Sequence, residues 1–438
     1  MSIVTQNAID DKHDNSIERA AYIWNTASGL LNAFQSVIML MVLTHVCDVT
    51  TAGIFTIAYA NANLFLNLGK YGVRNFQVSD VNENYEFAPY HAARLISVLA
   101  MIICGAAWTL WSALTVGYTL DKTLIILMML IFKAIDAYED VFHGNYQQHG
   151  RVDVGAKVLT FRMITMIILF AGLLIITRNL LLSLTVTTIF TGLFFIVETV
   201  WAKRKFRLPA GSIKLPTKGT LTQQAFALLK ECFPVFLATF LLFYIGNAPK
   251  YAIDAVMDDA AQAYYGYIAM PVFVVGLLAT FIYNPIIGSL SEDWVAGRAN
   301  RFAQRFALQV LIIIGLTVAC VLAGWLLGVP VLNMLYNADL AAYKIDLVIL
   351  LIGGGFLATA TLFTTGLTII RWQSKLIPGY VVISIAALLL CRPAVQLAGI
   401  DGASWIYLIL MAALTLWFGI VFALGIKAGQ QDQSGFIS

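Results

Sequence analysis

The sequence has few charged residues and few cysteines, and both shortages exclude classes of protein. Only 12% of its 438 residues are charged, and the net charge of +3 is too small for a nucleic-acid-binding surface. The five cysteines lack the spacing of a metal site, which predicts small apolar side chains and no disulfide. No GxSxG, HExxH or Gly-rich phosphate loop occurs. We therefore expect neither an enzyme nor a cofactor.

Long apolar runs make up most of the chain. Hydrophobic residues account for 60% of the sequence, and the mean hydropathy is +0.81. Many runs approach the length of about 20 residues that a helix needs to cross a bilayer, and they are continuous, unlike the alternating segments of membrane barrels. This pattern predicts an all-α, polytopic membrane protein. The expected spans are 20–43, 52–69, 90–117, 122–147, 154–177, 180–202, 226–256, 262–288, 302–327, 344–370, 376–398 and 402–426.

The distribution of Lys and Arg predicts the orientation of these twelve spans. With a cytoplasmic N-terminus, the inside loops and adjoining helix ends hold 21 Lys and Arg and the outside ones hold 5. Because positive residues favour the cytoplasmic side, we expect both termini in the cytoplasm. The polar N-terminus predicts no cleavable signal peptide.

The longest hydrophilic stretch between spans follows the sixth span and divides the chain into two lobes. Two sets of six spans suggest a duplicated transporter architecture, with two six-helix lobes around a central cavity that holds the substrate near the midplane. The expected parts are a polar N-terminus (1–19), the first lobe (20–202), a basic linker (203–225), the second lobe (226–426) and a tail (427–438).

The fourth span carries the densest group of ionisable residues, within IFKAIDAYEDVFHGNYQQ (131–148). Ionisable side chains inside a membrane are expensive and usually face a protein interior or a water-filled cavity. At 100° per residue, the group falls within about 80° of the helix circumference, with Lys133 deepest. This stripe predicts one wall of a vestibule open to the cytoplasm. Its members are Lys133, Asp136, Asp140, His143 and Gln147, with Glu139 beside them.

Two interpretations of this stripe remain open. Lys157 and Arg162 lie in the cytoplasmic half of the next helix, where they can meet Asp136 or Asp140. Such pairs hold a helix hairpin together, or the same groups contact substrate, and gating by breaking the pairs combines both. The spacing of Asp140 and His143 is that of a di-iron motif, but no second copy occurs, so we expect no metal.

The first span carries an uncharged polar stripe. Asn25, Ser28, Asn32, Gln35 and Ser36 fall within about 100° of one another. Helix packing through small polar residues explains the two serines. For the three amides, packing and a face toward a sugar or phosphate are equally consistent with the pattern.

Two further segments combine charges with special backbone residues. Arg74 and Arg94 flank the loop between spans two and three, where they suit bidentate recognition of a diphosphate or act as interface anchors, with Arg74 paired to Asp80. In IGNAPKYAID (245–254), a predicted helix break adjoins Lys250 and Asp254, which suits an outer gate or a surface ion pair. Prolines also predict kinks in the eighth span, at Pro271 and Pro285, and in the seventh, at Pro234.

As a whole, the chain resembles bacterial polysaccharide repeat-unit flippases, the O-antigen and capsule transporters of the multidrug/oligosaccharidyl-lipid/polysaccharide exporter superfamily. The resemblance covers nearly the whole twelve-span pattern. It is most specific in AGIFTIAYANANLFLNLGKYGVRNFQVSD (52–80) and AYEDVFHGNYQQHGRVDVGAK (137–157), and weaker in YYGYIAMPVFVVGLLATFIYNP (264–285).

This resemblance implies a flippase of the cytoplasmic membrane that moves an undecaprenyl-diphosphate-linked oligosaccharide from the inner to the outer leaflet by alternating access, for surface polysaccharide synthesis. Its implied partners are the bilayer and the polymerase and glycosyltransferases of that pathway. The residues expected to bind substrate are Arg74, Arg94, Lys133 and Arg162 for the diphosphate, and Asn25, Asn32 and Gln35 for hydroxyls. Those expected to gate or couple transport are Asp136, Glu139, Asp140, His143, Lys157, Lys250 and Asp254.

Two rival functions follow from the same pattern. A multidrug or metabolite exporter of the superfamily shares the architecture but favours an acidic, aromatic cavity. A membrane glycosyltransferase, ligase or polymerase commonly has a long outside loop with catalytic side chains, which this sequence lacks.

Overall fold

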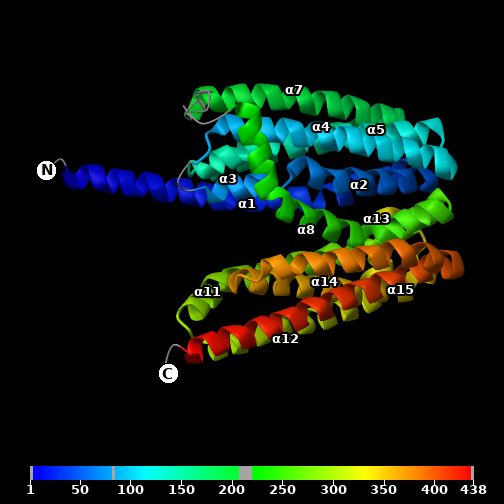
Figure 1. Ribbon diagram of the computed structural model, residues 1–438. Helices are drawn as coiled ribbons and strands as arrows, with labels where there is room; N and C mark the ends of the chain where they lie inside the picture. The colour runs from blue at the N-terminus through cyan, green and yellow to red at the C-terminus, as the bar shows by residue number, and fades with distance from the viewer. Residues whose placement is uncertain (1–2, 81–83, 207–219, 436–438) are drawn as a thin grey trace. The chain divides into compact units, whose positions relative to one another are not determined.

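The computed structural model describes residues 3–80, 84–206 and 220–435 of the chain, and confirms the all-α prediction. The described residues form α-helices with short 3-10 and π-helical segments, and no strand occurs among them. The first unit contains α1 (Ile3–Val46), α2 (Val49–Lys70), α3 (Val73–Ser79), α4 (Phe87–Ser112), α5 (Leu120–Gln148), α6 (Val152–Thr177), α7 (Leu180–Phe206) and the beginning of α8 (Leu221–Val256) (Figure 1). The second contains α9 (Asp259–Ala269), α10 (Pro271–Tyr283), α11 (Ile287–Val295), α12 (Ala299–Ala323), α13 (Val329–Tyr336), α14 (Lys344–Ile369) and α15 (Leu376–Gly435).

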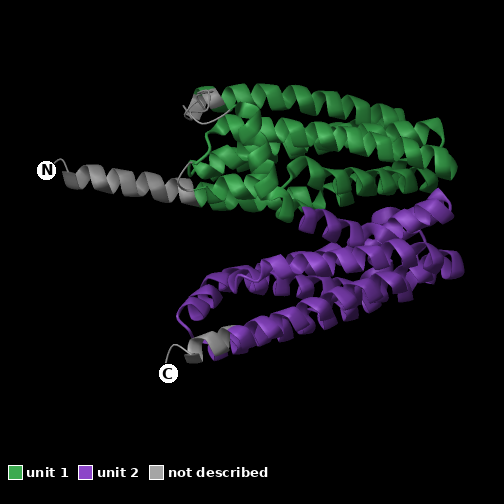
Figure 2. Cartoon of the chain, viewed as in Figure 1, with its two compact units in different colours: residues 1–236 green, residues 237–438 purple. Residues whose placement is uncertain are grey.

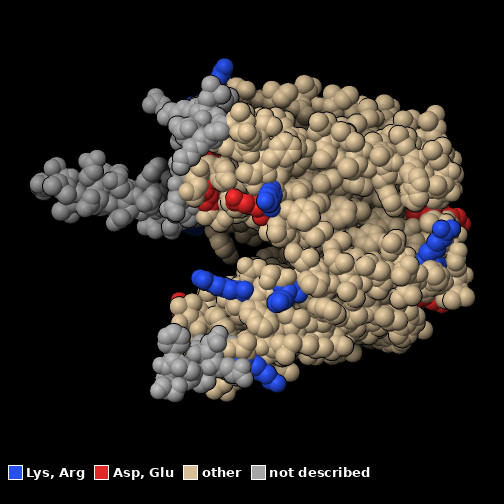
Figure 3. Space-filling model, viewed as in Figure 1, with Lys and Arg blue, Asp and Glu red and all other residues tan. Residues whose placement is uncertain are grey.

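The helices match the expected membrane spans. Ten described segments are long and apolar enough to cross a bilayer. The charged helix α5 is outside this set by composition, but it is long enough to cross as well, because its 29 residues extend about 43 Å at 1.5 Å per residue. The last segment contains two spans, since α15 changes direction at Ala398 and Gly399, where the φ of Gly399 is +57°. On the face in Figure 3, charged side chains lie toward the helix ends and leave a broad uncharged band.

The chain divides into two compact units, residues 1–236 and 237–438 (Figure 2). The boundary lies inside α8, and the second unit begins eleven residues after the expected start of the second lobe at 226. The beginning of α8 belongs to unit 1 because Phe236 stacks on Tyr71, with ring centroids 4.3 Å apart. Of the expected linker and terminal segments, residues 207–219, 1–2 and 436–438 lie outside the described part.

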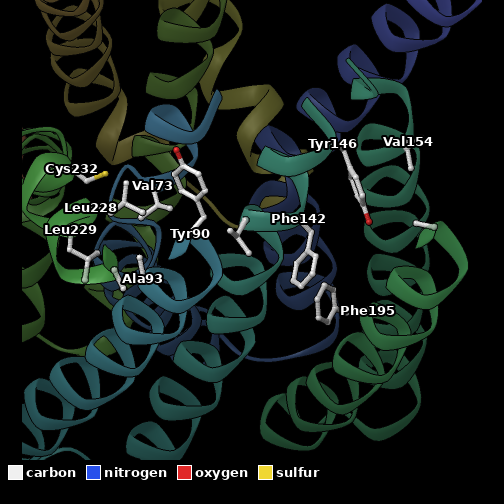
Figure 4. Packing of buried hydrophobic residues seen from close by; sticks show 13 residues of the cluster. Val73, Tyr90, Ala93, Phe142, Tyr146, Val154, Phe195, Leu228, Leu229 and Cys232 are labelled. Carbon is white, nitrogen blue, oxygen red and sulfur yellow. The ribbon is translucent and has the colours of Figure 1, made fainter. Parts of the chain in front are cut away.

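A buried apolar cluster holds one end of unit 1 together (Figure 4). Tyr90 of α4, Phe142 of α5 and Phe195 of α7 belong to it, and Leu228 and Cys232 contribute from α8. The cluster lies at the end of unit 1 where α5 turns into α6, which we call the α5–α6 end. It therefore fixes the helix ends around α3, which carries Arg74.

The eighth span is broken at both prolines, as predicted. Pro271 occupies the first turn of α10, where its missing N–H has no helical partner to lose. Pro285 lies in a short 3-10 segment, Asn284–Ile286, between α10 and α11. By contrast, the break predicted at Gly246 and Pro249 is wrong, because α8 continues through both residues. Neighbouring helices and local adjustments allow membrane helices to tolerate such residues.

Candidate functional site

Helix α5 lies among α2, α4, α6 and α7, and its polar stripe faces the interior of unit 1. Lys133, Glu139, Asp140 and His143 are buried, so the stripe faces other side chains rather than lipid. The structure divides its contacts into two ion-pair networks.

The first network, the Asp140 network, joins α3, α4 and α5. Arg94 donates from Nη2 to Asp140 Oδ2 at 2.8 Å and from Nη1 to the backbone oxygen of Gly69 at 2.8 Å. Arg74 donates from Nη1 to Asp140 Oδ1 at 3.3 Å and from Nη2 to Gln147 Oε1 at 2.9 Å. Arg94 is fully buried, whereas 34% of the Arg74 side chain is exposed.

The second network, the Arg162 network, joins α1, α5 and α6. Arg162 Nη2 lies 2.8 Å from Asp136 Oδ1 and 2.6 Å from Glu139 Oε2. Lys133 Nζ donates to Asp136 Oδ2 at 3.0 Å and to Gln35 Oε1, on α1, at 2.8 Å. His143 Nε2 lies 3.0 Å from Glu139 Oε1. A continuous chain of polar contacts thus runs from His143 to Gln35.

The prediction that α6 pairs with the stripe is confirmed for Arg162 and wrong for Lys157. Arg162 bonds to Asp136 as expected, whereas Lys157 Nζ lies over the Trp24 ring, 5.6 Å from its centroid. Five residues separate the two cations, so they point about 140° apart on one helix. Lys157 and Arg162 therefore cannot both face α5.

The pairing of Arg74 with Asp80 is also wrong, since Asp80 accepts hydrogen bonds from its own loop. Its carboxylate receives the backbone N–H groups of Asn84 and Tyr85, each at 3.0 Å, and the Tyr90 hydroxyl at 2.8 Å. Burial tends to raise the pKa of Asp80, but these hydrogen bonds outweigh it and lower the pKa. Asp80 therefore stabilises the loop as an anion.

A polar cavity of about 180 Å³ lies between α1, α3, α5 and α6 at the α5–α6 end of unit 1. Two of the three amides in the polar stripe of α1, Asn25 and Asn32, line this cavity, and so do Arg74 and His143. The two amides are exposed and form no hydrogen bond with other described side chains. The remaining lining residues are Ser28, Gly29, Gln147, Val152, Gly155, Ala156 and Leu159.

Gln35 lies deeper than this cavity and is fully buried. Besides the bond from Lys133, it accepts one from the Tyr59 hydroxyl at 3.4 Å. Lys250 and Asp254 belong to unit 2, on the last two turns of α8, where Lys250 is half-buried and Asp254 is buried. The predicted residues thus separate into cavity-lining, buried and second-unit groups.

Sequence reasoning missed Glu198 and Tyr59. Glu198 is buried on α7, and the charges of Glu139 and Arg162 act on it. Its signal in the sequence is a single carboxylate within the apolar run LFFIVETVW (193–201). Tyr59 gives no such signal, because a tyrosine in a membrane helix is ordinary; its ring lies under Lys133 Nζ at 4.9 Å.

The chain shares its fold with known transporters. It matches the lipid II flippase MurJ in an inward closed conformation with a TM-score of 0.68 and 13% identity, over 94% of this chain and 90% of that one. An inward-facing multidrug resistance MATE family transporter of the MOP superfamily matches with a TM-score of 0.65 and 11% identity, over 92% and 96%. The Vibrio cholerae MATE transporter VcmN, in its bent form, matches with a TM-score of 0.61 and 11% identity, over 95% and 99%.

No family model and no curated protein matches the sequence. At identities of 11–13%, the structural likeness establishes the fold, and function has to be argued from the site. The chain is therefore a multi-pass membrane protein with the fold of MATE transporters and MurJ.

Proposed function

We propose that the protein is a flippase that moves an undecaprenyl-diphosphate-linked oligosaccharide across the cytoplasmic membrane for surface polysaccharide synthesis. The observation that carries this proposal is the cavity in unit 1, where the amides of Asn25 and Asn32, which bond to no other described side chain, adjoin the guanidinium of Arg74. Amides bond to sugar hydroxyls, and a guanidinium bonds to phosphate. The pathway's polymerase then receives the product at the outer leaflet.

The proposed orientation places this cavity on the cytoplasmic side. The bias of Lys and Arg supports that orientation, since it puts both termini and the α5–α6 loop inside. A lipid-linked sugar made in the cytoplasm then meets the cavity before it crosses the membrane.

Among the four cations expected to bind diphosphate, exposure favours Arg74 as the first contact. Its side chain is 34% exposed, whereas those of Arg94, Lys133 and Arg162 are at most 2% exposed. Each of the buried three already bonds to Asp136, Glu139 or Asp140. We therefore propose that they position α5 and reach substrate only when helices separate during the transport cycle.

The size of the cavity supports binding of one part of a large substrate. Pockets that enclose a drug-sized ligand have about 300–1,000 Å³, and this cavity has about 180 Å³. It suits one sugar ring or one phosphate group, while the rest of a lipid-linked substrate stays outside it.

A multidrug exporter is the second candidate, and the likeness to MATE transporters supports it. The acidic residues of the Arg162 network are the groups that a cationic drug requires. Each is neutralised by a buried cation, however, and the cavity itself is lined by Arg74, His143 and uncharged groups. This lining favours an anionic head group over a cationic drug.

The test compares two arginines in cells that lack the chromosomal copy. Arg74→Gln should lower surface polysaccharide and leave lipid-linked intermediates on the cytoplasmic leaflet, as measured with a membrane-impermeant probe on inverted vesicles. The matched control, Arg178→Gln, changes an arginine at the opposite end of unit 1 and should retain polymer. If deleting the chromosomal copy changes drug accumulation and leaves surface polysaccharide normal, the protein is an exporter and the flippase proposal fails.

A further inference from the structure

A second cationic site lies in unit 2, at the corner where α11 meets α12 (Figure 1). Asp293 of α11 is buried, and three arginines surround its carboxylate. Arg298 Nε lies 2.9 Å from Oδ1, Arg305 Nη1 lies 2.7 Å from Oδ2, and Arg301 Nε lies 3.8 Å from Oδ1. This corner has no part in the cavity of unit 1.

The backbone of this corner is fixed in place. Gly297 adopts the left-handed conformation, with φ +73°, and donates its N–H to the oxygen of Trp294 at 3.0 Å. The next residue, Arg298, donates its N–H to the oxygen of Asp293 at 2.9 Å. These two bonds form a Schellman motif, which holds Arg298 beside the carboxylate before any ligand arrives.

The guanidinium groups have more donors than Asp293 can accept. The side chains of Arg298, Arg301 and Arg305 are 49%, 55% and 37% exposed, respectively. Arg301 is beyond hydrogen-bond distance of the carboxylate, and Glu292, although adjacent, forms no ion pair with the described arginines. Three cations against two carboxylates leave the corner positive, with donors suited to a phosphate.

An apolar stripe continues from these arginines along the same face of α12. Arg301, Arg305, Leu308 and Ile312 fall within about 60° of one another at 100° per residue. Leu308 is 54% exposed and Ile312 36% exposed. Since α12 begins a membrane-spanning segment at Ala299, the arginines lie at its boundary and the apolar residues lie further into the bilayer.

We propose that this corner binds the phosphate of an anionic membrane lipid, with the head group on Arg301 and Arg298 and an acyl chain along Leu308 and Ile312. The buried Asp293 keeps the arginines together and prevents their mutual repulsion from opening the corner. The inference is independent of the molecule that the protein transports.

The test measures binding of dioctanoyl phosphatidylglycerol and dioctanoyl phosphatidylcholine to the purified full-length protein in detergent. The protein should bind phosphatidylglycerol about tenfold more tightly, because only that lipid is a net anion. Arg301→Gln should remove most of this preference, while Asp293 keeps two close partners. The matched control is Lys375→Gln, which removes an exposed cation in the loop after α14 and should change the affinity less than twofold.

Three outcomes overturn the inference. They are equal affinity for the two lipids, an equal effect of Arg301→Gln and Lys375→Gln, and competition by inorganic phosphate as strong as that by phosphatidylglycerol. Should Arg301→Gln fail to fold, Leu308→Gln tests the same site through its acyl-chain contact and should lower the affinity for phosphatidylglycerol severalfold.

Discussion

Arg94 and Asp140 form a buried ion pair between α4 and α5, with Arg94 Nη2 donating to Asp140 Oδ2 at 2.8 Å. The same guanidinium donates from Nη1 to the backbone oxygen of Gly69, near the end of α2. One side chain thus joins three helices of unit 1. The sequence left open whether Arg94 binds substrate or is an anchor at the membrane interface, and the structure instead buries it as a link between helices.

Asp140→Asn should therefore destabilise the protein strongly. Removing one partner of a buried pair leaves an uncompensated charge, which costs about 3–5 kcal/mol. Thermal and denaturant unfolding of the purified protein measure the loss. Asp153→Asn is the control, because its partner Arg151 is partly exposed at the α5–α6 turn and such a pair contributes about 1 kcal/mol or less. Equal losses in the two variants would show that Asp140 has no anchoring role.

Lys133 and Gln35 should be energetically coupled. Their 2.8 Å hydrogen bond joins α5 to α1 in a buried position. A double-mutant cycle with Lys133→Met and Gln35→Leu should give an interaction free energy of about 0.5–3 kcal/mol in unfolding. Additive losses would mean that the bond contributes nothing beyond the separate packing of each side chain.

The sequence predicted the positions of the helices better than the contacts between them. Apolar runs and turn residues located the spans, because the bilayer requires long helices, and periodicity located the interior face of α5. Periodicity does not decide which partner a charge meets. Lys157 and Arg162 looked equivalent in the sequence, but only Arg162 points toward α5.

The segment between α2 and α4, which includes α3, also shows that the sequence does not determine which charges pair. Arg74 and Asp80 are close in sequence, yet Arg74 reaches Asp140 on α5, while Asp80 satisfies backbone donors in its own loop. Tertiary packing brings Asp140 within reach of Arg74, whereas the loop that follows Asp80 supplies its own donors to the Asp80 carboxylate. Glu198 was missed because its neighbours, Glu139 and Arg162, come from other helices.

Asp80 should make stability depend on pH in the acid range. Because its pKa is lowered in the folded state, its contribution is fully present above the usual value of 3.8 and is lost as pH falls through the lowered pKa. The difference in melting temperature between the wild type and Asp80→Asn should therefore be constant from pH 7 to pH 5 and shrink below pH 3.8. A difference that instead grows on acidification would mean that the pKa of Asp80 is raised.

Gly29→Leu should separate transport from stability. Gly29 lines the cavity of unit 1, and a Cβ added there meets no atom within 4 Å, so we expect a leucine to be accommodated and to fill part of the cavity. Because leucine favours a helix over glycine, we expect the unfolding free energy to rise by about 0.5–1 kcal/mol. Surface polysaccharide should nevertheless fall to about a tenth of normal or less, since the side chain takes the space proposed for the substrate.

The matched variant is Gly172→Leu on α6, which also has open space around its Cβ but does not line the cavity. It should gain similar stability and keep normal polysaccharide. Because the two substitutions are identical in chemistry, a transport loss confined to Gly29→Leu assigns the effect to the cavity. Normal polysaccharide from stable Gly29→Leu protein would remove this cavity from the transport route, and equal losses from both variants would trace the effect to helix stiffness instead.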